Sequence, residues 1–294
     1  MLSITKKMIF LPLKIIMLEK IRKYCFWDLA FKAIPVFSIL MLTTISNAQT
    51  IEVGGFGGTS YYLGELNPAL PYNQTQLAYG ALARYNLNSR WAIKLSYYRG
   101  KVQGSDATGS KTIDRDLNFK SNINDFSLVV EFNFWEYFTG STKSYVTPFI
   151  FGGIGYFTFK PTSFSGVALQ PIGTEGQKAG FEGRSPYNQS SLAFPFGFGF
   201  KYSVNKRIGL SFEWGMRKTL TDYIDDISTT YYLEGSNINP DNTAGILSDP
   251  TRSHDPNMQR GDDKTSDWYN YTGITVTYKF DLQSKKQCNN LDWK

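Results

Sequence analysis

Two adjacent segments of the chain alternate large apolar side chains with small or polar ones. Every second residue from Leu192 to Tyr202 is leucine, phenylalanine or tyrosine, and apolar side chains again take alternate positions from Ile208 to Met216. Successive side chains of a β-strand point to opposite faces, so each segment predicts a strand with one apolar face. The four residues from Val204 to Arg207 have the length of a hairpin connection.

The apolar faces of this hairpin favour a membrane barrel over a soluble sandwich. A sandwich would bury two adjacent rows of very large aromatic side chains, and would leave Glu213 and Arg217 facing water. In a closed barrel the aromatic rows face lipid, and the small and charged rows line the interior. We therefore predict an all-β fold, an eight-stranded antiparallel transmembrane β-barrel of the bacterial outer membrane.

Eight alternating segments can be counted after the first 48 residues. They are residues 50–63, 76–86, 91–99, a fourth segment ending near 134, and then 145–160, 191–203, 208–217 and 267–282. Connections after the first, third, fifth and seventh segments are long and the others are short. Outer-membrane barrels have short periplasmic turns and long outer loops, so both termini are expected in the periplasm. Segment 145–160 is apolar on both faces, and its pattern does not decide which face points inward.

The interior of an eight-stranded barrel is just wide enough for side chains to fill it. The charged residues expected to point inward are Glu52, Arg84, Lys94, Asp125, Glu131, Glu213, Arg217 and Lys279. They are four acids and four bases, and buried charges are tolerated when they are paired. The preferred interpretation is a structural plug of ion pairs, with a proton or ion path as the alternative. A general porin is not expected, because a filled lumen does not conduct.

The first 48 residues predict a secretory signal peptide. Basic residues precede an apolar run at 33–42, and Ser46-Asn47-Ala48 forms a small-x-small cleavage site. The apolar run is shorter than the ~20 residues of a membrane-spanning helix. Residues 1–16 add a second basic-apolar patch, which suggests that translation starts at Met17. Cleavage would leave residues 49–294 as one outer-membrane barrel domain with a short periplasmic tail.

Removal of this leader changes the charge and the cysteine content of the chain. Seven of the 31 Lys and Arg and two of the 25 Asp and Glu precede residue 49, which leaves 24 bases and 23 acids. The calculated pI of about 9.0 therefore does not imply a nucleic-acid partner. Cys25 would leave with the leader, and Cys288 would remain alone, without an internal disulfide or a cysteine metal cluster.

The sequence offers little for catalysis. The one histidine, His254, lies between Ser253 and Asp255 in a loop, whereas a catalytic relay is assembled from separate strands or loops. We expect a solvated loop histidine and a protein that is not an enzyme, with no cofactor and no small-molecule substrate. A lipid-modifying enzyme, with His254 as its candidate residue, is a further alternative.

Acidic residues gather near the ends of the longest loop. They are Asp222, Asp225 and Asp226 at its start and Asp262, Asp263 and Asp267 at its end. Carboxylates clustered in this way can hold calcium, but their spacing matches no EF-hand loop. Solvation or helix capping is the preferred interpretation, and no metal site is predicted.

Several longer blocks resemble a known family. YYLGELNP (61–68), RDLNF (115–119), DFSLVVEFNF (125–134), LQPIGTEGQ (169–177) and EWGMRKTLTDYIDDISTTY (213–231) follow one another along the chain. Together they resemble the PorG-like outer-membrane barrel family of the type IX secretion system, over nearly the whole mature chain. The resemblance implies a non-enzymatic accessory whose periplasmic side associates with a ring formed by a lipoprotein and its partner. Its characteristic outer loops would carry Gly173, Thr174, Glu175, Gly176 and Gln177, with Asp222, Asp225 and Asp226.

Two functions follow as hypotheses. In the first, the barrel sits in outer-membrane lipid and positions the periplasmic ring proteins through its short turns. The contact candidates are Trp135, Tyr137, Phe138 and Arg207, since aromatic residues and arginine dominate interfaces. In the alternative, the long outer loops, above all residues 220–266, bind a ligand or a host surface.

Overall fold

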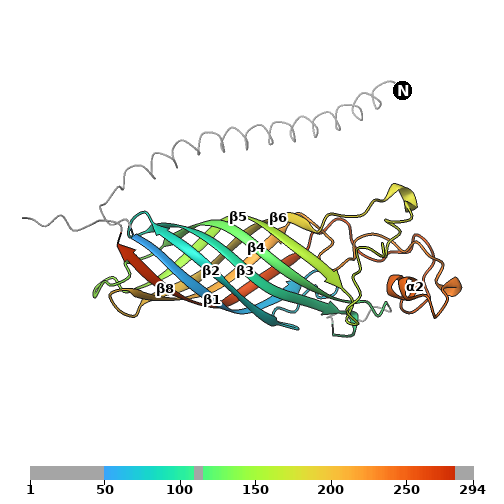
Figure 1. Cartoon of the computed structure of the whole chain (residues 1–294), viewed down its shortest axis with the longest axis horizontal. Helices are drawn as coiled ribbons and strands as arrows, with labels where there is room; N and C mark the ends of the chain where they lie inside the picture. The colour runs from blue at the N-terminus through green and yellow to red at the C-terminus, as the bar shows by residue number, and fades with distance from the viewer. Residues whose placement is uncertain (1–49, 109–114, 282–294) are drawn as a thin grey trace, which may run out of the picture. The chain divides into compact units, whose positions relative to one another are not determined.

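Within residues 50–108 and 115–281, which are the residues that this computed structural model describes, eight antiparallel strands close into one barrel (Figure 1). The strands are β1 (Thr50–Leu63), β2 (Gln76–Asn86), β3 (Trp91–Ser105), β4 (Asn118–Asn133), β5 (Val146–Thr162), β6 (Ser190–Ser203), β7 (Ile208–Thr219) and β8 (Trp268–Asp281). Each strand pairs with the next along the chain, and β8 pairs with β1 to close the barrel. The predicted eight-stranded barrel is confirmed. The predicted leader and Cys288 lie outside the described residues.

Strand β3 is longer than its apolar pattern predicted. Residues 100–105, expected to begin a loop, continue β3 and pair with Asn118–Ile123 of β4. Lys101 and Gln103 take the outward positions of this extension, so the alternation of apolar and polar residues stops there. The backbone hydrogen-bond ladder nevertheless continues, because it needs no apolar outer face.

Pairing with its neighbours decides which face of β5 points inward. Phe149, Phe151, Phe157 and Phe159 are buried in the lumen, whereas Ile150 and Ile154 are exposed on the outside. The register of β5 against β4 and β6 fixes this choice. The phenylalanines supply much of the apolar filling of the barrel.

The outer surface of the barrel is a belt of exposed apolar side chains. Leu77 is 80% exposed and Ile154 is 61% exposed, and β6 alone exposes Leu192, Phe194, Phe196, Phe198, Phe200 and Tyr202. Soluble proteins rarely expose contiguous apolar patches beyond a few hundred Å². A closed barrel also pairs every backbone group along its wall, as a bilayer requires. The fold is therefore that of an outer-membrane β-barrel. No helix in the described part of the chain has the length and apolarity to cross a bilayer.

The two ends of the barrel differ in the length of their connections. The loop end, as we call it, carries the connection between β3 and β4 and the connections 64–75, 163–189 and 220–267, of which the last two extend well beyond the strands (Figure 1). These contain the short helices η1 (Asp106–Thr108), η2 (Phe181–Gly183), η3 (Gly235–Asn237) and α2 (Thr243–Ser248). The turn end carries the connections 87–90, 134–145 and 204–207, together with Thr50 and Asp281.

Candidate functional site

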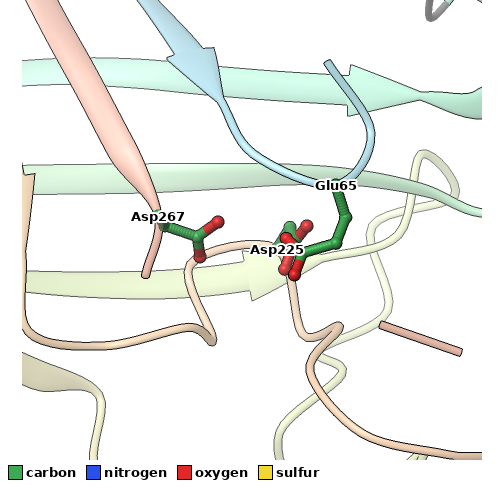
Figure 2. Close-up of side chains that lie close together, drawn as sticks. All are labelled: Glu65, Asp225 and Asp267. Atoms are coloured by element: carbon green, nitrogen blue, oxygen red, sulfur yellow. The ribbon is translucent and has the colours of Figure 1, made fainter. Parts of the chain in front are cut away.

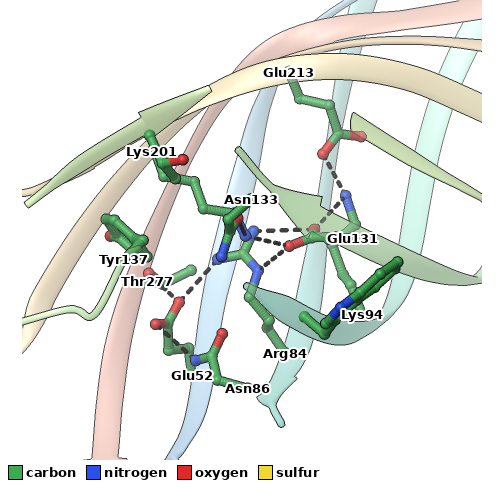
Figure 3. Close-up of polar contacts among 12 residues, drawn as sticks. Glu52, Arg84, Asn86, Lys94, Glu131, Asn133, Tyr137, Lys201, Glu213 and Thr277 are labelled. Atoms are coloured by element: carbon green, nitrogen blue, oxygen red, sulfur yellow. Dashed lines mark hydrogen bonds and ion pairs between the residues drawn. The ribbon is translucent and has the colours of Figure 1, made fainter. Parts of the chain in front are cut away.

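A network of ion pairs fills the turn-end half of the lumen (Figure 3). At its centre Glu131 accepts from Arg84 (Nε to Oε2, 2.7 Å) and pairs with Lys201 (Nζ to Oε2, 2.6 Å) and Lys94 (Nζ to Oε1, 3.4 Å). Arg84 also donates from Nη1 to Oε2 of Glu52 at 2.9 Å. Neutral donors complete the network, and those on Glu52 are Asn86, Thr139 and Thr277.

A second part of the network continues toward the loop end. Lys94 also pairs with Glu213, and Arg217 lies between Glu213 (3.9 Å) and Asp125 (3.4 Å). Asp125 accepts a hydrogen bond of 2.8 Å from the Tyr269 hydroxyl. The Arg217 guanidinium also lies 4.7 Å from the centroid of the Tyr271 ring. Stacked aromatic rings follow, with Phe56 and Tyr98 centroids 4.4 Å apart.

The buried charges of this network balance. Its members, all 2% exposed or less, are the acids Glu52, Asp125, Glu131 and Glu213 and the bases Arg84, Lys94, Lys201 and Arg217. Sequence reasoning named Lys279 in place of Lys201. Lys279 is only half-buried near the turn end, opposite Glu52 in the register of β8 against β1. The missed Lys201 could have been found, because it lies on the polar face of the β6 pattern with Gly197 and Gly199.

The loop-end connections fold together into a compact cap. Glu175 accepts from the backbone N–H groups of Ser228 and Thr229 and from Nη1 of Arg260, at 2.8, 3.0 and 3.0 Å. Asp226 accepts from the hydroxyls of Thr174 and Tyr187. The two sequence blocks 173–177 and 221–226 therefore contact each other through Thr174 and Asp226, which are 52 residues apart.

Burial in this cap corrects the expectation of solvation for Asp225, Asp226 and Asp267, whereas Asp263 is exposed as expected. Asp225 and Asp226 are 1% and 0% exposed, and all five residues from Gly173 to Gln177 are buried. Asp222 is half-buried. None of the three aspartates caps a helix. Burial raises the pKa of Asp226 to about 6, against the opposing effect of the Arg260 charge.

Three carboxylates from three segments meet beneath the cap (Figure 2). Glu65 follows β1, Asp225 lies in the β7–β8 connection and Asp267 directly precedes β8. The Tyr62 hydroxyl lies 2.6 Å from Asp225 Oδ2, 2.8 Å from Asp267 Oδ1 and 3.4 Å from Glu65 Oε2. Burial, and then the charge of Asp222, raises the pKa of Glu65 to about 8. Burial and the neighbouring carboxylates also raise the pKa values of Asp225 and Asp267.

A cavity of about 720 Å³ lies beside these carboxylates. Glu65 and Asp262 line it together with Arg115, Arg260 and the apolar side chains of Met216 and Trp268. Arg115 is held by Asp106 (Nη2 to Oδ1, 2.7 Å) and by the backbone carbonyl of Arg260. Its lining combines the strand residues Leu63, Met216 and Trp268 with residues of the loop-end connections.

His254 is not the solvated histidine that the sequence suggested. Its ring stacks on Tyr231 with centroids 4.2 Å apart, and Nδ1 lies 2.9 Å from Oδ1 of Asp249. The neighbouring Asp255 and Ser253 do not form this contact, because the partner comes from the end of α2. The arrangement packs His254 into the cap.

The predicted contact residues at the turn end differ in their exposure. Trp135 is 58% exposed, Arg207 is exposed and bonded to the Tyr278 hydroxyl at 2.8 Å, and Phe138 is half-buried. The prediction that Tyr137 contacts a partner is wrong, because its side chain is 5% exposed and its hydroxyl lies 3.2 Å from Thr139 Oγ1. Its ring helps to close the turn end of the lumen and cannot reach a partner protein.

The closed wall, the apolar belt and the filled interior define a small outer-membrane β-barrel protein. The chain belongs to the family described as "Domain of unknown function (DUF6089)", whose model matches residues 31–290. No curated protein matches it.

Solved bacterial outer-membrane proteins resemble the chain at low identity. It is similar to the N-terminal β-barrel domain of OprF from Pseudomonas aeruginosa (13% identity, TM-score 0.36), covering 80% of this chain and 100% of that one. It is also similar to Ail of Yersinia pestis, with 10% identity and a TM-score of 0.38 over 80% of this chain and 99% of that one. Neisserial surface protein A is similar too, with 12% identity and a TM-score of 0.39 over 79% of this chain and 97% of that one. Similarity at this level says nothing about the function of this chain.

Proposed function

We propose that this protein is a non-enzymatic accessory of a type IX secretion system, which anchors or positions a periplasmic ring at the outer membrane. The observation that carries the anchoring role is the sealed lumen. Glu131 alone contacts three buried bases there, and aromatic side chains fill the space above them. Such a barrel offers membrane attachment without a transport path. The secretion system itself is inferred from the resemblance of the sequence blocks to the PorG-like family.

In this proposal the turn end faces the periplasm and meets the ring. Its exposed side chains include Trp135 and Arg207, which are residue types that dominate interfaces. Arg90, Lys143 and Lys206 are also exposed on the three turns. The expected contact surface is therefore aromatic and basic.

Copurification from crosslinked cell envelopes tests the proposal. Tagged wild-type protein should recover the lipoprotein and its ring partner, and Trp135→Ala and Arg207→Ala should each lower that recovery. Phe164→Ala and Lys178→Ala are matched controls, because these side chains are exposed at the loop end. Recovery of the barrel alone from wild-type envelopes would contradict the proposal.

The loop-end cavity favours one second candidate, a surface protein whose outer loops bind a ligand or a host surface. Its lining mixes charged groups such as Glu65 and Arg115 with Met216 and Trp268, as ligand pockets commonly do. Deletion of residues 234–254 separates the two functions. Intact secretion with lost surface binding would favour this candidate over the anchor.

A further inference from the structure

Four basic side chains gather on the outer wall of the barrel toward the loop end. They are Arg99 and Lys101 on β3, Lys120 on β4 and Lys160 on β5, and all four are exposed. In the register of these strands Lys101 and Lys160 lie on either side of Asn122. Adjacent strands are about 4.8 Å apart and alternate residues of one strand about 7 Å, so the four bases share one patch roughly 10–15 Å across. We call it the basic patch.

An aromatic row on the same three strands marks the edge of the apolar belt beneath the basic patch. Tyr97, Phe126 and Tyr156 are neighbours across β3, β4 and β5 and take outward positions. The Tyr97 hydroxyl donates to Oδ1 of Asn124 at 3.2 Å, on the side of the patch. Aromatic side chains occupy the boundary between hydrocarbon and headgroups in membrane barrels. The basic patch, which begins two residues further along β3, therefore lies at the level of the lipid headgroups.

The protein does not neutralise the charges of the basic patch. Within residues 50–108 and 115–281 none of its four bases forms an ion pair with an acidic side chain. The acids of β3, β4 and β5 are Asp125 and Glu131, and both point into the lumen, where they pair with Arg217 and Arg84. The other outward residues of the patch are asparagine, glutamine or threonine, which can donate hydrogen bonds to an anion. A field of one sign attracts ions of the opposite sign, so the patch favours a multiply charged anion.

A recess in the wall gives the basic patch a shape. Lys101, Gln103, Lys120 and Thr162, all in outward positions, line a cavity of about 240 Å³. The Lys120 side chain is restrained there by the Phe164 ring, whose centroid lies 4.8 Å from Nζ. The patch is therefore a shaped surface and not a set of isolated lysines.

The number of bases fits a headgroup with two phosphate monoesters. A phosphate monoester carries about −1.5 to −2 charges at pH 7, so two of them carry about −3 to −4. The phosphodiester of a common glycerophospholipid carries a single negative charge. The long connections of outer-membrane barrels face outward, so the basic patch lies in the outer leaflet. Lipid A, the diphosphorylated glycolipid of that leaflet, has both the charge and the place.

We propose that Arg99, Lys101, Lys120 and Lys160 bind the phosphate groups of one lipid A molecule on the outer wall of the barrel. The acyl chains of this lipid lie along the apolar belt of β3, β4 and β5, below the aromatic row. Such binding requires the loop end to face outward, as the proposed function also assumes, but it does not require the periplasmic ring. Lipid A binding and copurification of the ring can therefore fail independently.

Native mass spectrometry of the purified full-length protein in a mild detergent tests the proposal by counting added lipid molecules. We expect one bisphosphorylated lipid A per chain, held more tightly than phosphatidylglycerol and not displaced by millimolar inorganic phosphate. A basic residue near an anionic membrane surface strengthens binding about fivefold. The triple variant Lys101→Gln, Lys120→Gln and Lys160→Gln should therefore bind lipid A more than about tenfold more weakly.

The matched control removes three exposed lysines away from the basic patch, as Lys143→Gln, Lys178→Gln and Lys264→Gln. It should bind lipid A like the wild type, and an equal loss there would overturn the proposal by showing attraction to net charge alone. Equal affinity of the wild type for phosphatidylglycerol, or displacement of lipid A by inorganic phosphate, would overturn it as well. Should the triple variant fail to fold, Lys120→Gln alone decides: a loss of about fivefold supports the site, and an unchanged affinity overturns it.

Discussion

Removal of the Glu131 charge tests whether the lumen network holds the barrel together. Glu131 is fully buried and contacts Arg84, Lys201 and Lys94 at 2.7, 2.6 and 3.4 Å. Glu131→Gln keeps the shape of the side chain but removes one of the four buried acids. Four buried bases would then face three acids, and each base near position 131 would lose a charged partner.

The expected cost is large for a single substitution. Breaking a buried ion pair by removing one partner destabilises proteins by about 3–5 kcal/mol, because a charge stays buried without compensation. Three bases share Glu131, so we expect the free energy of unfolding to fall by at least the lower figure. Lys201→Met in the same chain restores the balance of three acids and three bases, and should recover a large part of the loss.

Urea unfolding of the detergent-solubilised barrel, followed by tryptophan fluorescence and by heat-modified gel migration, measures this difference. Glu136→Gln is the control, since Glu136 is an exposed acid on the next turn and surface changes usually stay within about 0.5 kcal/mol. A Glu131→Gln midpoint equal to that of the control would refute the reasoning. So would a double variant less stable than Glu131→Gln alone.

Three further predictions concern other parts of the molecule. In planar bilayers the purified protein should show no unitary conductance, because paired charges and aromatic rings fill its lumen; a stable open channel would contradict this. Gly176→Ala should destabilise the cap by about 1–3 kcal/mol, since Gly176 has φ of 80° and a Cβ there would lie 2.6 Å from Phe181 Cβ. Limited proteolysis should show this, with a smaller effect for Gly166→Ala, which has φ of 88° but no neighbour within 4 Å. His254→Ala should lower the local stability of the α2 region by about 1 kcal/mol, because the hydrogen bond between His254 and Asp249 is lost. Faster amide exchange in this region would show the effect, and secretion should be unchanged.

Local pattern was enough to predict the barrel wall. Outward residues such as Leu77 and Ile274 alternate with inward ones, and that alternation depends only on the geometry of a single strand. Lys101 and Gln103 show where the pattern fails, because the strand continues past the apolar belt. The register on both sides was needed to orient β5, whose two faces are equally apolar.

The cap shows the opposite case. Asp225 and Asp226 look like solvated loop residues in the sequence, because a charge run is locally a surface signal. Their partners come from distant positions: Tyr62 is 163 residues from Asp225, and Arg260 is 34 residues from Asp226.

The sequence by itself thus determined the eight strands, apart from the end of β3, and the lipid-facing side of every strand except β5, since both follow from the period of two along each strand. Tertiary structure alone decided that Tyr137 is closed off from partners and that Asp225, Asp226 and Asp267 turn inward. These outcomes depend on which segments meet in space, and no local pattern carries that information.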